Sequence, residues 1–147
     1  MNIFYLHKDP AKAASYFYDK HKVKMILEAA QMLCTAHHHY AELYEYDDSY
    51  IPYKKAHYNH PSTQWVRGNA IQYQYAYDMF VALCDEYTYR YGRTHLTDEK
   101  LRGLLNQLPN NISLGQWSEP PQCMPDDVKV EGNSLNAYHK YYAKYKK

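Results

Sequence analysis

Several features that would identify a function class are scarce or missing in this chain of 147 residues. Its three cysteines, Cys34, Cys84 and Cys123, are odd in number and far apart, so they predict neither a disulfide framework nor a zinc knuckle. There is no glycine-rich phosphate loop, no strained turn carrying a serine nucleophile, and no Cys/His/Asn catalytic arrangement. These absences argue against nucleotide hydrolases, esterases and thiol proteases.

Long apolar runs and an excess of charge are missing as well. No stretch approaches 18 consecutive apolar residues and the N-terminus lacks the apolar core of a secretory signal. We therefore expect a cytoplasmic protein with no membrane partner, in the host cytoplasm if the chain is viral. The formal net charge is only +1, whereas long-range attraction to nucleic acid requires a strongly basic protein. Any contact with nucleic acid must then depend on local groups of cations.

Tyrosine is abundant, although the other aromatic residues are scarce: there are 19 Tyr, three Phe and two Trp. A tyrosine ring is apolar and its hydroxyl needs a partner, so this composition fits rings at half-buried boundaries or in grooves. It fits equally well a core in which Tyr replaces Phe and Leu. The chain has the length of one domain and shows no repeat or linker, so we expect a single helical domain over residues 1–147.

The hydrophobic pattern predicts an all-α fold, a compact bundle of about four to five helices with a long Pro-rich loop near the C-terminus. Asp9 and Pro10 fit the N-cap and first position of one helix, and Thr97 fits the N-cap of another. Gly92 fits a C-terminal stop. The expected segments are an extended stretch at 2–6, helices at 10–16, 19–40, 62–91, 98–107 and 135–146, and loops at 45–61 and 109–133.

The segment 19–40 has the clearest helical period. Its core face is expected to consist of Val23, Ile26, Leu27, Ala30, Leu33, Cys34 and His37. Spacings of three and four residues put His21, Lys24, Glu28 and Gln31 side by side on the other face. A carboxylate beside an imidazole and an ammonium can act as a general acid or base. The same pattern also fits a solvated face with a weak Lys24–Glu28 ion pair.

A second candidate is the segment 59–67, where a helix is expected to begin. Helix N-termini present free N–H groups and positive partial charge, which suit phosphate. Arg67 could add a bidentate contact, although the segment also fits a helix cap in which Trp65 anchors the core. The candidate binding residues in this segment are Asn59, His60, Trp65 and Arg67.

The consecutive histidines at 37–39 suggest metal ligands at first sight. Successive residues of a helix point about 100° apart, so the three side chains cannot all face one ion. No cysteine or aspartate completes a zinc spacing. We therefore expect neither a metal nor another cofactor.

The C-terminal segment 138–145 alternates aromatic rings with positive charge. Rings that stack on bases and lysines that contact phosphates favour sequence-tolerant binding of nucleic acid. An amphipathic helix packed on the domain by its tyrosines would have the same pattern. The candidate binding residues here are Tyr141, Tyr142 and Lys144.

The order of several short blocks resembles a known family. In the segment 19–28, His21 precedes Glu28 by seven residues, which resembles the segment around the catalytic glutamate of phage pyrimidine-dimer DNA glycosylases of the endonuclease V type. The segment 59–68 and the helix after it resemble the next blocks of that family. The segment 140–144 is similar to its aromatic, basic C-terminus.

This resemblance implies a compact helical protein that binds DNA and removes damaged or modified pyrimidines, with an associated AP-lyase step. In that family an N-terminal amine attacks the sugar C1′ and forms a Schiff base that leads to strand cleavage. Carried over, Glu28 would stabilise the intermediate and assist proton transfer, and His21 would be its neighbour. The amine of Met1 would be the nucleophile, with Lys22 or Lys24 as substitutes.

The chain also departs from the family pattern. Position 2 is Asn, where members carry a small residue such as Thr, and Leu27 and Gln31 stand where arginines are expected. A second hypothesis is therefore a non-catalytic protein that binds a nucleotide or signalling nucleotide on the same scaffold, because a nearly neutral chain suits a small ligand. A structural or protein-interaction module is the third, supported by the tyrosine content.

Overall fold

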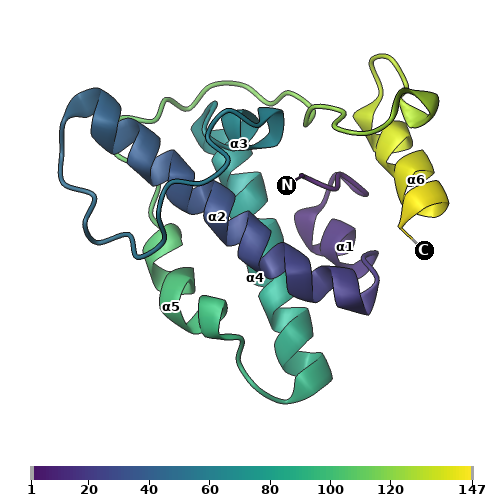
Figure 1. Ribbon diagram of the computed structural model, residues 1–147, viewed down its shortest axis with the longest axis horizontal. Helices are drawn as coiled ribbons and strands as arrows, with labels where there is room; N and C mark the ends of the chain where they lie inside the picture. Colours follow the sequence, from purple (N-terminus) through teal and green to yellow (C-terminus); the bar gives the residue numbers. More distant parts are fainter. Residues whose placement is uncertain (1, 147) are drawn as a thin grey trace.

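The computed structural model describes residues 2–146, which contain six α-helices, one 3₁₀ turn and no β-strand. The elements are α1 (Pro10–Ser15), α2 (Asp19–Tyr44), α3 (Pro61–Val66), α4 (Ala70–Tyr91), α5 (Leu96–Leu105), η1 (Asp126–Val128) and α6 (Ser134–Tyr145). The long helices α2 and α4 pack against each other, α1 packs on α4, and α5 packs on both (Figure 1). The expected all-α fold is confirmed, with four long helices and two short ones.

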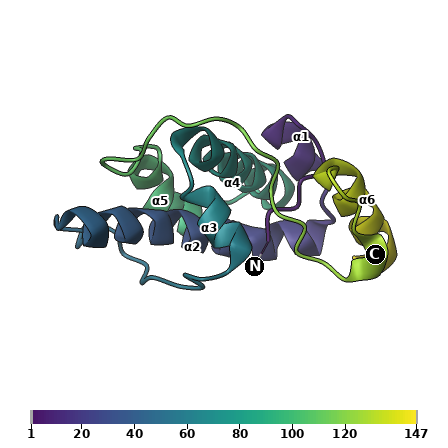
Figure 2. The same cartoon turned by 90° about the horizontal axis from the view of Figure 1, so that it is seen from above.

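The segment 106–125, referred to below as the strap, runs from α5 across the molecule to α6. Figure 2 shows α2 on one side, α1 and α4 on the other, and the strap passing over them. Hydrogen bonds fix the strap where α3 and α4 meet: the N–H of Ala70 donates to Ser113 O (2.8 Å) and Trp65 Nε1 donates to Ser118 O (3.1 Å). The strap therefore connects α5 to the opposite end of the molecule, where α6 lies. No helix in the described part of the chain could span a membrane.

Helix α2 is buried on more than one face, which corrects part of the periodic prediction. We expected Leu27 in the core, but its side chain is 43% exposed. Thr35, expected on the polar face, is fully buried because the loop 45–60 covers that side. Its hydroxyl donates to Ala56 O and accepts from Ala56 N, both at 3.0 Å. The outer face of α2 is therefore open to solvent near its start, at Lys20, Lys24 and Leu27, and again in its last turn, residues 42–44.

The continuous helix expected at 62–91 is wrong, because the chain breaks between α3 and α4. Asn69 adopts an extended conformation and caps α4, its side chain accepting a hydrogen bond from Gln72 N (2.9 Å). Gly68 makes the break possible, since a Cβ there would lie 2.7 Å from Gln72 Nε2. Asn69 Nδ2 also donates to Gln116 O (2.9 Å), so the same residue fixes the strap.

Replacing Asn69 with Ala should lower the free energy of unfolding by about 2 kcal/mol, because both the helix cap and the bond to the strap are lost. The matched control is Asn133→Ala. Asn133 caps α6 by accepting from Asn136 N, and its loss should cost about 1 kcal/mol. Urea unfolding of the two variants measures both values. Equal losses would show that the strap bond adds nothing.

The three consecutive histidines of α2 face different partners, as expected. His37 bonds the buried Tyr73 hydroxyl (2.8 Å), His38 pairs with Asp48 (2.6 Å), and His39 bonds the hydroxyl of Tyr58 (2.6 Å). Among residues 2–146, no group of three His, Cys, Asp or Glu side chains is arranged to hold a metal ion. These histidines fasten α2 to its neighbours.

Candidate functional site

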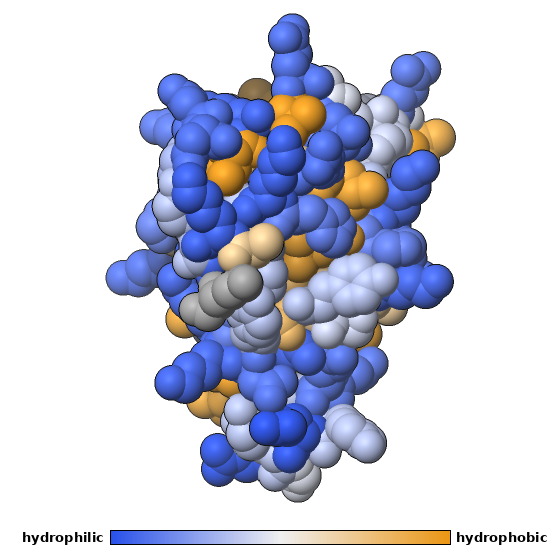
Figure 3. All heavy atoms as spheres, turned by 90° about the vertical axis from the view of Figure 1, so that its right-hand side faces the viewer, coloured by the Kyte–Doolittle hydropathy of each residue, from blue (hydrophilic) through white to orange (hydrophobic). Residues whose placement is uncertain are grey.

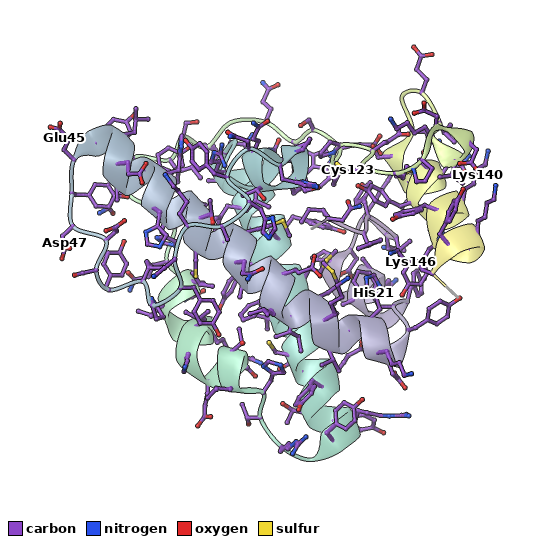
Figure 4. All side chains as sticks on the ribbon, viewed as in Figure 1. His21, Glu45, Asp47, Cys123, Lys140 and Lys146 are labelled. Atoms are coloured by element: carbon purple, nitrogen blue, oxygen red, sulfur yellow. The ribbon has the colours of Figure 1, made fainter. Side chains whose placement is uncertain are left out.

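A small polar cavity of about 200 Å³ lies where both ends of the described chain meet α2. It is lined by Asn2, Phe4, His21, Lys24, Met25, Glu28, His60, Cys123, Tyr141 and Lys146. Figure 4 shows His21 and Lys146 close together at this end of the molecule, with Cys123 farther along the strap. The face that carries α6 is largely hydrophilic, with small apolar areas between the polar side chains (Figure 3).

Glu28 belongs to the α2 face predicted from the helical period. Its side chain is only 14% exposed, and the ammonium of Lys24, one turn earlier, lies 3.7 Å from Oε2. The Lys24 side chain is 68% exposed, so solvent screens its ammonium and the pair adds little to stability. The ammonium of Lys24 can therefore move to an incoming anionic substrate while Glu28 stays fixed by the helix.

His21 is held in one orientation by aromatic rings and a tyrosine hydroxyl. Its ring stacks on Phe17 at 5.1 Å and meets the edge of Phe4 at 4.4 Å between centroids. The N–H of Tyr18 donates to the Tyr142 hydroxyl (2.7 Å), and that hydroxyl lies 3.1 Å from His21 Nδ1. Because the hydroxyl oxygen already accepts a bond, its proton is free to be donated to Nδ1.

The charge of His21 follows from the same surroundings. Burial, together with the ammonium groups of Lys146 and Lys24, lowers the pKa of His21 to about 4, against the opposing effect of Glu28. The ring is therefore neutral at pH 7. With Nδ1 accepting, its proton sits on Nε2, so His21 offers a neutral hydrogen-bond donor and no positive charge.

His60 reaches the cavity from the start of α3. Its Nδ1 accepts from Ser62 N (3.1 Å) and caps the helix, which leaves the proton of the neutral ring on Nε2. Burial lowers the pKa of His60. The segment 59–67, expected to form a helix N-terminus, thus places the imidazole of His60 in the same cavity as Glu28. Asn59, beside His60, is exposed and does not line the cavity.

Other candidates from the segments 19–40 and 59–67 lie elsewhere. Lys22 points toward α4, where its ammonium pairs with Glu86 (2.9 Å), and Gln31 lies beyond the lining residues. Trp65 is buried as a core anchor with its indole N–H bonded to the strap. Arg67 is also buried: Nη1 donates to Tyr58 O (2.8 Å), and the guanidinium stacks on that ring at 3.9 Å from its centroid.

The C-terminal candidates divide in the same way. Tyr141 lines the cavity, and Tyr142 acts on it through His21. Lys144 is ion-paired with Asp127 of η1 and does not line the cavity. Met1, the expected nucleophile, lies outside the described residues.

Sequence reasoning missed Asn2, Cys123 and Lys146 as lining residues. Asn2 is buried: its Nδ2 donates to Cys123 O (2.8 Å) and its Oδ1 accepts from the Tyr138 hydroxyl (2.5 Å). The sequence did contain one indication for Asn2, because it is a polar residue at the start of the apolar stretch 2–6. Nothing in the sequence separates Lys146 from the other lysines of the tail.

Comparison with known proteins identifies a family for this chain. The sequence model of a family described as pyrimidine dimer DNA glycosylase matches residues 1–100. The matched part includes His21, Lys24, Glu28 and His60 and ends before the strap and α6. Neither a curated protein nor a solved structure matches the chain.

Proposed function

Because the chain belongs to the pyrimidine dimer DNA glycosylase family, we propose that it releases damaged or modified pyrimidines from DNA at the cavity around Glu28. DNA repair by a glycosylase is the general function of the family, and DNA is its substrate. The observation that carries the proposal is the gathering of Glu28, Lys24, His21 and His60 in one polar cavity. A carboxylate among nitrogen groups meets the needs of proton transfer during cleavage of a glycosidic bond.

The proposed reaction begins with an unprotonated amine that attacks C1′ of the damaged nucleotide. The new N–C1′ bond forms as the bond from C1′ to the base nitrogen breaks, and the proton that the attacking amine then loses passes to the departing base. The sugar ring opens as its ring oxygen takes a proton from water, which gives a protonated Schiff base that the Glu28 carboxylate stabilises. In the AP-lyase step, loss of a C2′ proton breaks the bond between C3′ and its oxygen.

The α-amine of Met1 is the nucleophile we propose. An α-amine has a pKa of about 7.7–8.0, against about 10.4 for lysine, so a larger fraction is unprotonated at neutral pH. Asn2, the next residue, lines the cavity, and so does Lys24, which is the substitute amine. The ammonium of Lys22 forms an ion pair with Glu86 on another face of the protein.

The size of the cavity favours excision over enclosure of a free nucleotide. Sites that enclose a whole small ligand usually measure about 300–1,000 Å³, whereas this cavity measures about 200 Å³. It suits a site that acts on one part of a long substrate. The damaged nucleotide would rotate out of the duplex to reach it, at a lower cost than an undamaged one.

The test uses a duplex with a single cyclobutane pyrimidine dimer, incubated with the protein and borohydride. We expect a covalent adduct that maps to the N-terminal peptide by mass spectrometry, and no adduct with undamaged duplex. Lys24→Gln should still form the adduct, whereas mapping to Lys24 would reassign the nucleophile. The proposal is refuted if no damaged duplex gives either a covalent adduct or base release.

A further inference from the structure

The cavity contains a second cation that the proposed reaction does not use. Lys146 directly follows α6, and its ammonium lies over two aromatic rings, 5.7 Å from the centroid of Phe4 and 5.4 Å from that of Tyr141. Both rings also line the cavity. Contact with ring faces holds an ammonium in place without neutralising its charge.

The neighbouring lysines are paired differently. Lys144 forms an ion pair with Asp127 of η1, and Lys24 lies beside Glu28. Within residues 2–146, Lys146 forms no ion pair with a carboxylate. No carboxylate of the described residues therefore offsets the Lys146 ammonium at the cavity, whereas the imidazole of His21 is neutral at pH 7.

Contacts with the start of the chain fix the position of α6. The ring of Tyr141 stacks on Phe4 at 5.9 Å between centroids. Tyr138, fully buried, donates its hydroxyl proton to Asn2, and Tyr142 bonds His21. These three tyrosines of α6 thus hold the helix against the start of the chain and α2, and this fixes the position of Lys146 at its end.

We propose that Lys146 binds the DNA phosphate next to the nucleotide whose base enters the cavity. This rests on the proposed function, which supplies DNA as the ligand. An ammonium without a carboxylate partner acts as a point charge for phosphate. Leu27 and Gln31 stand at the two α2 positions where the resemblance leads us to expect arginines, so these positions add no charge to that of Lys24, which lies beside Glu28. Lys146, which follows α6 and lies outside the family-matched segment, supplies a second positive charge at the cavity.

Salt-dependent binding of Lys146→Gln to the dimer-containing duplex tests this assignment, with Lys144→Gln as the matched control on the same helix. Loss of one phosphate contact should reduce the slope of log affinity against log salt concentration by about one. At low salt, affinity should fall by about tenfold. Lys146→Arg should restore both, and Lys144→Gln should leave both unchanged. An unchanged slope in Lys146→Gln overturns the assignment.

A second measurement checks the position of the ammonium without DNA. The charged groups around His21 are Lys146, Lys24 and Glu28. NMR titration should show that Lys146→Gln raises the pKa of His21 above its value of about 4, and that Lys144→Gln does not. No shift in Lys146→Gln overturns the assignment.

The two proposals fail separately. A protein that binds the duplex but releases no base refutes the glycosylase activity, and the salt slope still decides the role of Lys146. Normal base release with an unchanged slope in Lys146→Gln refutes only the phosphate contact. If the wild-type protein binds no duplex, both are refuted.

Discussion

Glu28→Gln should slow base release from dimer-containing DNA by about 10²- to 10⁴-fold, the usual contribution of a positioned acid or base. Glutamine has nearly the same shape but neither exchanges a proton nor carries the charge that stabilises a cationic intermediate. DNA binding should be unchanged or slightly tighter, because a negative charge is removed from a cavity that faces phosphates. Single-turnover kinetics measures the chemical step, and fluorescence anisotropy measures binding.

Glu86→Gln is the matched control for that variant. Glu86 is a partly buried glutamate on α4 that pairs with Lys22 away from the cavity. Its replacement also breaks an ion pair, so any general effect of losing a carboxylate appears in both variants. Only Glu28→Gln should lose base release. A Glu28→Gln protein that retains wild-type kinetics would exclude proton transfer by this carboxylate.

Local rules explain the part of the site that the sequence could predict. His21, Lys24 and Glu28 share a face because an α-helix repeats every 3.6 residues, and the structure places all three at the cavity. Asp9 caps α1 and Gly92 ends α4 with a positive φ of 66°, as expected from their conformational preferences. Each of these features depends on residues within a few positions of each other.

The rest of the site depends on contacts between distant segments. Asn2 and Tyr138 are 136 positions apart and meet only because the strap carries α6 back to the start of the chain. The sequence shows that the tail is aromatic and basic, but Lys144 and Lys146 differ only in what the fold puts beside them: Asp127 for one, and aromatic rings for the other. Periodicity carries no information about such partners.

Contacts between distant segments decide the surroundings of three residues that local preference describes differently. Asn69 fits the inner stripe of a continuous helix, and only its bonds to Gln72 N and Gln116 O reveal a helix cap. Leu27 fits the core stripe of α2, yet its side chain is 43% exposed because no element within residues 2–146 covers that side. Arg67 suits phosphate by chemistry, but the nearby Tyr58 ring and carbonyl hold its guanidinium inside the protein. Tertiary contacts override local preference in each case.

Acidification from pH 7 to pH 4.5 should destabilise the folded protein, with about 2 kcal/mol of the loss coming from His37 alone. His37 is buried, its Nε2 lies 2.8 Å from the Tyr73 hydroxyl, and that hydroxyl donates to Leu105 O (2.8 Å). The hydroxyl can therefore only accept from His37, which fixes the neutral ring with its proton on Nε2. Burial lowers the pKa of His37 to about 4, from 6.5.

The direction follows from proton binding in the two states. Between pH 6.5 and pH 4 the unfolded chain binds the proton and the folded protein does not, so stability falls as the pH falls. Below about pH 4 both states are protonated and this loss levels off. His21, with the same shift, adds in the same direction by a smaller amount because it is less buried.

Urea unfolding at pH 7 and pH 4.5 measures the effect, with His37→Gln as the comparison. The variant loses stability at both pH values because Gln fills the site less well, so the informative quantity is the change with pH. That change should be about 2 kcal/mol smaller in the variant than in the wild type. Equal pH dependence would mean that His37 takes up its proton inside the fold, and the α2–α4–α5 junction would then have to tolerate a buried charge.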